Sequence, residues 1–327
     1  MSALFKPSFL SVLLALNLLA MNSAWAGLAF ITNQGENTVS VIDTQTNEIL
    51  NTIRVGKSPV GIAVSESDHR AYVSNVDDQS ISVIDTQSLK LIQNINIQGS
   101  PVGLLINPHQ KTLYIADWTD DRIYLLDTST MQVNGQINIG KAPAGMAISP
   151  NGDILYVANR DSNDVAVINT HSLEVVHRIK VGQHPFGVSI SQNGQQLYAV
   201  NVVSNSVSII NTENFNSFTV KTGDHPYCVT PSKDGRLLYV TNTQDDSISV
   251  IDIAAKKRVS EIKVGQVPEG IQTDMDSGNI YVANWGSNEV TVIDGEAQKV
   301  IQQIKTGEKS RAFGAFIMQE VTNRIAK

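Results

Sequence analysis

The chain has 327 residues, 42% of them apolar and 17% charged, and is long enough to bury a full-sized core in one compact body. Its formal net charge of −7 argues against a general nucleic-acid binder, because that kind of binding depends largely on clustered Lys and Arg. The one cysteine, Cys228, excludes an internal disulfide, so the predicted fold depends on burial alone.

The first residues have the pattern of an export signal. Lys6 precedes an apolar run over residues 9–21, and an Ala-x-Ala pattern occupies residues 24–26. This predicts a signal peptide over residues 1–26, cleaved after Ala26. The apolar run is shorter than the about 20 residues that a membrane-spanning helix needs. We therefore expect a periplasmic or secreted protein that is soluble after cleavage and has no membrane span.

A repeated motif runs through the rest of the chain. An aromatic residue, two further residues and then Asn or Asp recur at steps of 42 residues, with one step of 41. The aromatic positions are Phe30, Tyr72, Tyr114, Tyr156, Tyr198, Tyr239 and Tyr281. A proline ahead of an apolar strand marks six copies, and Ser310 stands at the seventh place. Seven such copies predict a repeat architecture.

Each copy predicts four short strands and no helix. In one copy the strands are residues 61–65, 71–75, 81–85 and 91–97. Short strands at this spacing indicate all-β structure, and about forty residues per four-stranded sheet is the period of a β-propeller. We therefore predict a single domain over residues 27–327, a seven-bladed β-propeller of four-stranded antiparallel blades.

The order of the motifs predicts how the ring closes. After residue 26 the chain begins with an aromatic strand and lacks the proline strand that precedes it in other copies. Residues 311–318, at the other end of the chain, supply a matching strand. We expect this C-terminal strand to complete the N-terminal blade and so to join the first blade to the last.

Three motifs carry a resemblance to a known family. Tyr-Val-Ala-Asn at residues 156–159, Val-Ile-Asp at residues 83–85 and Val-Gly-x-x-Pro-x-Gly at residues 181–187 resemble the signatures of the YVTN-repeat, or YncE-like, propellers. The resemblance implies a seven-bladed propeller but several functions. Members include periplasmic binding proteins, some of which bind single-stranded DNA, surface-layer proteins, lactonase-like enzymes and propellers attached to haem, copper or quinone oxidoreductases. A shared fold does not choose among these functions.

Candidate functional residues lie where the seven copies differ. The loop that enters the innermost strand and the loop between the second and third strands share one face, here called the top face. Around the motif proline, the first three copies carry small or aliphatic residues, whereas later copies carry His, aromatic and charged ones. These divergent residues, with a tryptophan from the second loop, are the predicted ligand-binding set: His184, Phe186, His225, Tyr227, Glu269, Trp285, Lys309 and Arg311.

Several chemistries fit this set. Two imidazoles and a thiolate suit a soft metal, so His184, His225 and Cys228 form a candidate site for copper, zinc or haem iron. Lys309 and Arg311, with the histidines, suit a small anionic ligand. These divergent residues form what we call the lip of the central channel. The alternative is that the lip residues vary without a function and that their side chains are only solvated.

Two tryptophans add a second kind of candidate. Trp118 and Trp285 each follow the polar end of a second strand, where other copies have smaller or polar residues. Each ring is either an anchor for a partner or a side chain folded back over its own blade.

The motifs of common enzymes are absent from the sequence. It has no Gly-x-Ser-x-Gly elbow, no His-Glu-x-x-His helix and no Cys-x-x-Cys-His for haem attachment. A lactonase-like hydrolase would use a lip histidine as base, Glu269 as acid and Arg311 to hold an oxyanion. Single-stranded DNA, which favours a basic aromatic surface, is the weaker alternative.

We therefore expect a monomeric, exported and non-catalytic propeller. It would bind a small ligand, a metal or cofactor, or a periplasmic partner protein across its top face. The alternatives are an accessory subunit of a periplasmic oxidoreductase and a lactonase-like hydrolase that uses the same lip.

Overall fold

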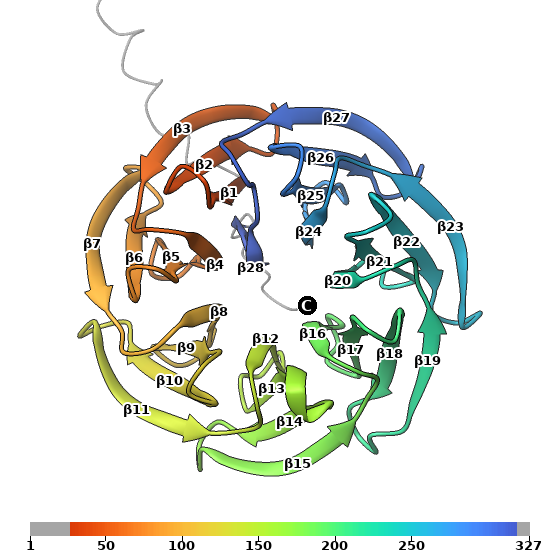
Figure 1. Ribbon diagram of the computed structural model, residues 1–327, viewed down its shortest axis with the longest axis horizontal. Helices are drawn as coiled ribbons and strands as arrows, with labels where there is room; N and C mark the ends of the chain where they lie inside the picture. Colours follow the sequence, from red (N-terminus) through yellow and green to blue (C-terminus); the bar gives the residue numbers. More distant parts are fainter. Residues whose placement is uncertain (1–26, 319–327) are drawn as a thin grey trace, which may run out of the picture.

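Seven small sheets surround a central axis (Figure 1). The computed structural model describes residues 27–318, so the predicted signal peptide lies outside the described residues. Each sheet is one blade, numbered here 1 to 7 along the chain, and consecutive strands within a blade are antiparallel. The predicted all-β, seven-bladed fold is confirmed. Over residues 27–318, no helix is long and apolar enough to cross a membrane.

The strand bounds follow the repeat. Blade 1 consists of β1 (Leu28–Asn33), β2 (Thr38–Asp43), β3 (Glu48–Arg54) and β29 (Ile317–Met318). Blade 2 consists of β4 (Pro59–Ser65), β5 (Arg70–Asn75), β6 (Ser80–Asp85) and β7 (Lys90–Asn96), with β28 (Phe313–Ala315) at its inner edge. Blade 3 consists of β8 (Pro101–Ile106), β9 (Thr112–Asp117), β10 (Arg122–Asp127) and β11 (Gln132–Asn138). Blade 4 consists of β12 (Pro143–Ile148), β13 (Ile154–Asn159), β14 (Asp164–Asn169) and β15 (Glu174–Lys180), with a short 3-10 turn, η1 (Arg160–Ser162). Blade 5 consists of β16 (Pro185–Ile190), β17 (Gln196–Asn201), β18 (Ser206–Asn211) and β19 (Ser217–Lys221). Blade 6 consists of β20 (Pro226–Pro231), β21 (Leu237–Asn242), β22 (Ser247–Asp252) and β23 (Lys257–Lys263). Blade 7 consists of β24 (Pro268–Thr273), β25 (Ile280–Asn284), β26 (Glu289–Asp294) and β27 (Lys299–Lys305).

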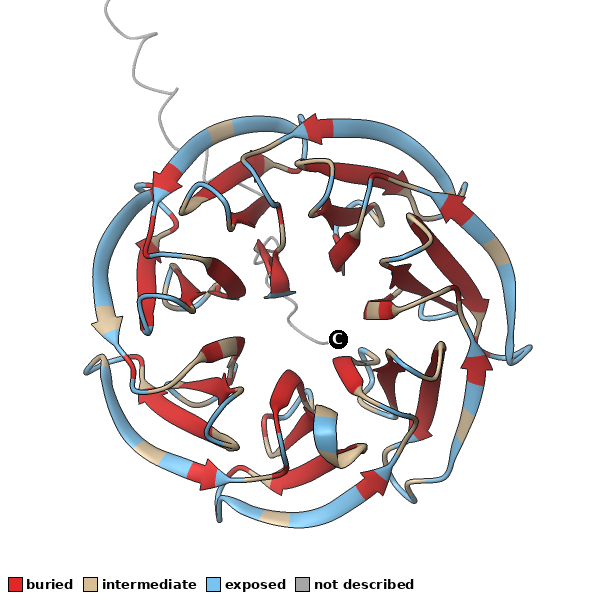
Figure 2. Cartoon of the chain, in the orientation of Figure 1, coloured by how far each residue is buried: buried red, intermediate tan, exposed pale blue. Residues whose placement is uncertain are grey.

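The core lies between neighbouring blades. Figure 2 shows the inner strands buried and the outer strand of each blade largely exposed. Strands β5 and β6 are apolar or small on both faces because each blade is covered on both sides. The motif aromatics fill the space between blades and are among the largest fully buried side chains: Phe30, Tyr72, Tyr114, Tyr198, Tyr239 and Tyr281.

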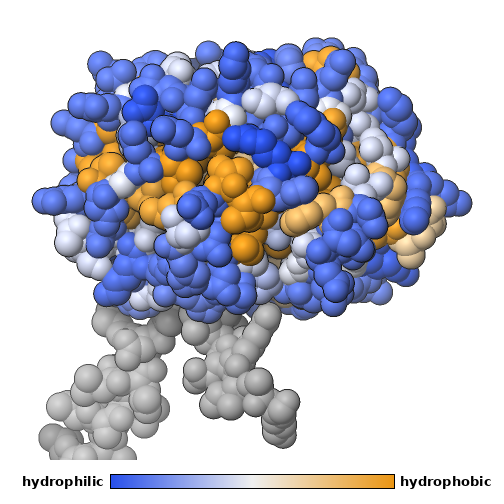
Figure 3. Space-filling view, turned by 90° about the horizontal axis from the view of Figure 1, so that it is seen from below, coloured by the Kyte–Doolittle hydropathy of each residue, from blue (hydrophilic) through white to orange (hydrophobic). Residues whose placement is uncertain are grey.

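The outer strands carry aliphatic side chains at the rim of the ring. Figure 3 views the ring edge-on and shows apolar residues gathered between the hydrophilic top and bottom. The exposed aliphatics of the outer strands are Ile49, Leu91, Ile92, Val133, Val176, Val259, Val300 and Ile301. Charged residues lie on the same strands, such as Glu174, Arg178 and Lys180 on β15, and they disfavour pairing with the edge of another chain.

The Asn that ends the second strand links the top loops. In blade 5, Asn201 accepts a hydrogen bond from the backbone N–H of Gly182 at 2.9 Å and donates one to the Ser208 hydroxyl at 3.0 Å. Asn242 does the same with the N–H of Gly223, at 3.1 Å. A Cβ on Gly182 would lie 2.6 Å from the Asn201 side chain, so only glycine fits there. These repeated residues stabilise the scaffold.

The C-terminal segment closes the ring, as predicted. Strand β29 pairs antiparallel with β1, with Ile317 opposite Ala29, and Ser310 forms a bridge to Asn33. The closing segment is interrupted, however: β29 pairs with β1, whereas β28 pairs parallel with β4 (Figure 1). The reason is local: Ala312 and Gly314 have φ of 53° and 125°, which a regular strand does not adopt.

Candidate functional site

The backbone of the lip is the same in nearly every blade. The residue before the inner-strand proline has a positive φ, 51° at His184 and 49° at His225. Its N–H donates to a side chain of the preceding blade, from His184 to Asn163 at 2.8 Å and from His225 to Asn205 at 3.1 Å. Equivalent bonds hold Ser58, Ala142, Val267 and Lys309. The lip side chains therefore differ in chemistry while the turn that presents them stays constant.

Aromatic side chains close the mouth of the central channel. The ring of Phe186 lies 4.2 Å from that of Tyr227 and 4.9 Å from that of Phe313, measured between centroids. Trp118, on the other side of the axis, lies 5.6 Å from Phe186. We call these four residues the aromatic plug. Residues of blades 2 and 4, Val60 and Ala144, belong to the same apolar cluster, so the plug fills the axis at the top.

Phe313 was not among the predicted site residues. It comes from β28, and its sequence position gave no sign that the closing segment would turn into the channel. Phe186 and Tyr227, both predicted ligand-binding residues, lie at the mouth of the channel, and Phe186 is only 4% exposed. Phe186 directly follows the inner-strand proline of its blade. The residues at the same place in blades 2 and 4, Val60 and Ala144, are buried too.

Arg311 connects three blades beside the plug. Its Nε lies 2.5 Å from Glu269 Oε2, its Nη2 donates to the Tyr227 hydroxyl at 2.9 Å, and its Nη1 donates to Gln34 Oε1 at 3.2 Å. The Nε and Oε2 atoms are not aligned as hydrogen-bond donor and acceptor, so their contact is an electrostatic pair. Burial raises the pKa of Glu269, and the Arg311 guanidinium opposes that rise. Glu269 and Arg311 therefore form an ion pair with each other inside the mouth of the channel.

Trp285 and Lys309 form the outer part of the lip near blade 1. The indole N–H of Trp285 donates to Gln34 Oε1 at 3.1 Å, so the ring reaches the neighbouring blade. Lys309 Nζ lies 5.2 Å from the centroid of that ring, a cation–π contact. Across the axis, Arg160 makes a similar contact with Trp118, at 5.5 Å. Both tryptophan rings are thus half-buried at the edge of the top face, and each contacts a cationic side chain.

The two histidines and the cysteine do not meet. His225 Nδ1 lies 3.0 Å from Asp224 Oδ1, and this hydrogen bond is the main cause that holds the pKa of Asp224 below its usual value. His184 Nε2 lies 3.9 Å from Asp161 Oδ1. Cys228 is buried, and burial raises the pKa of its thiol. Among residues 27–318, no three His, Cys, Asp or Glu side chains are grouped so that they could hold a metal ion.

The channel below the plug holds a cavity of 310 Å³. Its lining comes from the inner strands of blades 3 to 7, the turns after two of them and β28, and includes Leu105, Met146, Ile190 and Met275. None of the described lining residues is charged. The cavity is therefore uncharged and lies on the other side of the plug from the lip residues.

Two family models match parts of the chain. One, for YNCE-like β-propellers, matches residues 190–279, and the other, for seven-bladed lactonase β-propellers, matches residues 125–217. No curated protein matches the chain.

Three solved structures are similar in fold. Hydrazine synthase of Kuenenia stuttgartiensis has a TM-score of 0.73 at 23% identity, with 81% of this chain and 91% of that chain covered. A functionally unknown protein from Desulfotomaculum acetoxidans DSM 771 has a TM-score of 0.74 at 19% identity, with 88% and 99% covered. The dihydro-heme d1 dehydrogenase NirN, in complex with DHE, has a TM-score of 0.65 at 16% identity, with 85% and 63% covered. At these identities the likeness shows the fold alone.

Proposed function

The chain belongs to the YncE-like seven-bladed β-propeller family, and on that premise we propose that it is a non-catalytic, exported protein that docks a partner protein across its top face. The observation that carries this proposal is the aromatic plug. Because Phe186, Tyr227 and Phe313 fill the mouth of the channel, the divergent lip offers a surface and not an enclosed pocket.

The residues left at that surface suit contacts with a protein. The side chains of His184 and His225 are 36% and 42% exposed, and Trp285 lies half-buried under Lys309. Val203, in the neighbouring top loop of blade 5, is 48% exposed. Aromatic and apolar groups framed by polar ones are typical of the central part of a protein interface.

The charge of the top face favours a partner with a cationic surface. Acidic residues outnumber basic ones in the top loops, where Asp161 and Asp224 lie beside the lip histidines. The acids are Glu36, Asp77, Asp78, Asp120, Asp121, Asp161, Asp224, Asp245, Asp246 and Glu308, and the bases are Lys57, Lys141, Arg160, Lys309 and Arg311. A surface of one predominant sign attracts a partner of the other sign and speeds their association.

The partner class we propose is a periplasmic oxidoreductase, to which this chain would be an accessory subunit. Two of the similar solved structures carry the names of redox enzymes, a hydrazine synthase and a dehydrogenase. A lactonase-like hydrolase has less support, because its proposed acid, Glu269, and its proposed oxyanion group, Arg311, are paired with each other. The acidic top loops also weigh against a small anion or single-stranded DNA as ligand.

Site-specific cross-linking in the native cells tests the proposal. A photoreactive amino acid replaces Val203 on the top face or, as the matched control, Val176 on the rim, which is 56% exposed. We expect one main cross-linked protein from position 203 and none from position 176. Purified partner should then bind the Trp285→Ala and Lys309→Ala variants at least about tenfold more weakly, as expected for anchor residues.

The control for the binding measurement is Lys299→Ala on the outer strand β27, which should bind as the wild type does. Equal cross-linking at positions 203 and 176, no cross-link at position 203, or unchanged affinity in both lip variants would contradict docking at the top face.

A further inference from the structure

A second cavity lies on the bottom face, at the opposite end of the strands from the lip. It has a volume of 730 Å³ and opens between blades 5 and 6. Its walls are the loop between β16 and β17, the outer part of blade 5, the loop between β20 and β21, and the turn between β22 and β23. It is larger than the channel cavity and shares with it only residues 192 and 231, at its inner side. This volume lies within the range of small-molecule sites, about 300 to 1,000 Å³.

Several of the corresponding crevices between other blades are bridged by hydrogen bonds, whereas the crevice between blades 4 and 5 is crossed by the stacked rings of His177 and Phe215. Between blades 6 and 7, the Tyr239 hydroxyl donates to the Gly295 carbonyl at 2.6 Å. Between blades 7 and 1, the Tyr281 hydroxyl donates to Asn47 Oδ1 at 2.7 Å. These bonds join the second strand of one blade to the outer turn of the next.

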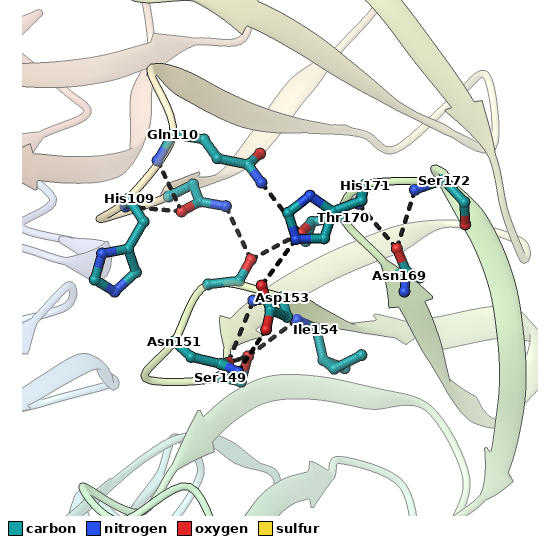
Figure 4. Close-up of polar contacts among 12 residues, drawn as sticks. His109, Gln110, Ser149, Asn151, Asp153, Ile154, Asn169, Thr170, His171 and Ser172 are labelled. Atoms are coloured by element: carbon teal, nitrogen blue, oxygen red, sulfur yellow. Dashed lines mark hydrogen bonds and ion pairs between the residues drawn. The ribbon is translucent and has the colours of Figure 1, made fainter.

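Side chains also fill the crevice between blades 3 and 4 (Figure 4). There the Gln110 amide donates to the Thr170 hydroxyl at 3.4 Å, and His109 Nε2 lies 2.9 Å from the Pro150 carbonyl oxygen. His171 extends the same network to Asp153, at 2.9 Å. These bonds join blades 3 and 4 across the crevice.

The crevice between blades 5 and 6 is not closed in this way. The hydroxyl of Tyr198 donates to Gln196 Oε1 of its own strand, at 3.1 Å, instead of reaching the next blade. The contact that crosses the crevice is a cation–π pair, with Lys256 Nζ 4.6 Å from the centroid of the Phe218 ring. This contact joins the outer strand of blade 5 to the outer turn of blade 6, and both residues line the 730 Å³ cavity.

Two departures from the repeat coincide at this crevice. The step from Tyr198 to Tyr239 is the one of 41 residues, and β19 has five residues where every other outer strand has seven. In the turn of blade 6, Ile253 follows the Asp, where the turns of blades 1 to 5 have Thr. Those threonines are Thr44, Thr86, Thr128, Thr170 and Thr212. In a ring of similar blades, the place where length and bonding both change is a candidate for a specific role.

The chemistry of the walls indicates what the crevice would hold. Arg236 makes no ion pair with any of the described residues, and Lys256 has only the ring contact. The nearby carboxylate of Asp234 is satisfied locally by the Ser232 hydroxyl at 2.5 Å and the Arg236 N–H at 3.0 Å, and these bonds lower its pKa. Glu213, the other acid of the lining, is exposed to solvent, as are Arg236 and Lys256. Two cations thus remain for an anion.

Most of the other lining residues form hydrogen bonds without being charged. Gln192, Asn193, Gln196 and Thr212 carry amides and a hydroxyl, which both donate and accept. Such groups match the hydroxyls of a sugar. We propose that the crevice between blades 5 and 6 binds a small hydroxylated anion, a sugar acid or a sugar phosphate. This site is independent of the top face.

Calorimetric titration of the full-length mature protein tests the proposal with four probes. Gluconate and glucose 6-phosphate carry both hydroxyls and charge, glucose carries the hydroxyls alone, and inorganic phosphate carries the charge alone. We expect binding of at least one of the first two and weaker or no binding of the last two. Binding of gluconate alone identifies a sugar acid, and binding of glucose 6-phosphate alone identifies a sugar phosphate.

Matched variants locate the site. Arg236→Gln should weaken binding about tenfold or more, the loss that follows when one charge-assisted hydrogen bond is removed. Arg258→Gln, on β23 of the same blade, removes an equal charge outside the crevice and should bind as the wild type does. No heat from either hydroxylated anion at millimolar concentration, equal affinity for inorganic phosphate, or equal weakening in both variants would overturn the proposal.

Discussion

Removing the charge of Glu269 should destabilise the ring closure. In Glu269→Gln the side chain keeps its shape, but Arg311 loses the carboxylate that lies 2.5 Å away. Breaking a buried ion pair by removing one partner costs about 3 to 5 kcal/mol. Arg311 keeps its bonds to Tyr227 and Gln34, and its side chain is 21% exposed, so we expect the lower end of that range, about 3 kcal/mol.

Urea unfolding at neutral pH measures this cost as a lower midpoint at unchanged slope. Glu261→Gln is the matched control, because Glu261 pairs with Lys263 at 2.9 Å on the exposed outer strand, where a pair contributes at most about 1 kcal/mol. The double variant Glu269→Met/Arg311→Met should be more stable than Glu269→Gln, since it leaves no buried charge alone. A loss in Glu269→Gln no larger than that in Glu261→Gln would refute the reasoning.

Three further predictions concern closure, plug and core. Truncation after residue 310 removes β28 and β29, so the protein should aggregate, and size-exclusion chromatography that found a folded monomer would contradict the closure. Phe186→Ala should cost about 3 to 5 kcal/mol in urea unfolding because it empties the centre of the plug, and a cost under about 1 kcal/mol would exclude a packed plug. Burial raises the pKa of Tyr198 from 10.0 to about 12. Because the folded state favours the neutral phenol, the stability it contributes is complete below pH 10.0 and is lost as the pH rises through about 12. Tyrosinate absorbance should therefore show a late phase that Tyr198→Phe reduces, whereas complete ionisation near pH 10.0 in the folded protein would contradict this burial.

The fold was predictable because the same sequence motif recurs in every blade. One aromatic, one polar strand end and one proline recur seven times, and each recurrence places a strand in the same environment. The split of the closing strand was not predictable, because it depends on the φ angles of Ala312 and Gly314. Nothing in the residue types alone requires those angles at Ala312, and only the packing of Phe313 into the plug explains why the segment turns inward.

The repeat pattern singles out the residues around the inner-strand prolines but not the direction in which each side chain points. The residue after each proline faces the axis, so Phe186 and Tyr227 pack inward and the charged pair follows them. The residue before each proline faces outward, which leaves His184 and His225 half-exposed and apart from Cys228. The positions just before and just after the proline thus face in opposite directions. A comparison of the seven copies shows that both positions diverge, but it does not show which of them faces the axis.

The ring departs from symmetry at the lip and at the crevice between blades 5 and 6, and these two departures differ in their cost to the fold. Side chains of the preceding blade hold the lip backbone at His184 and His225, so the side chains at these two positions can change at little cost to the scaffold. In the crevice, by contrast, the Tyr198 hydroxyl does not make the bond between blades that Tyr239 and Tyr281 make, and such a bond contributes about 1 kcal/mol. A departure that costs stability needs a reason more than one that costs nothing. The bottom crevice is therefore the place to which we assign a small molecule, and the lip is the surface to which we assign a partner protein.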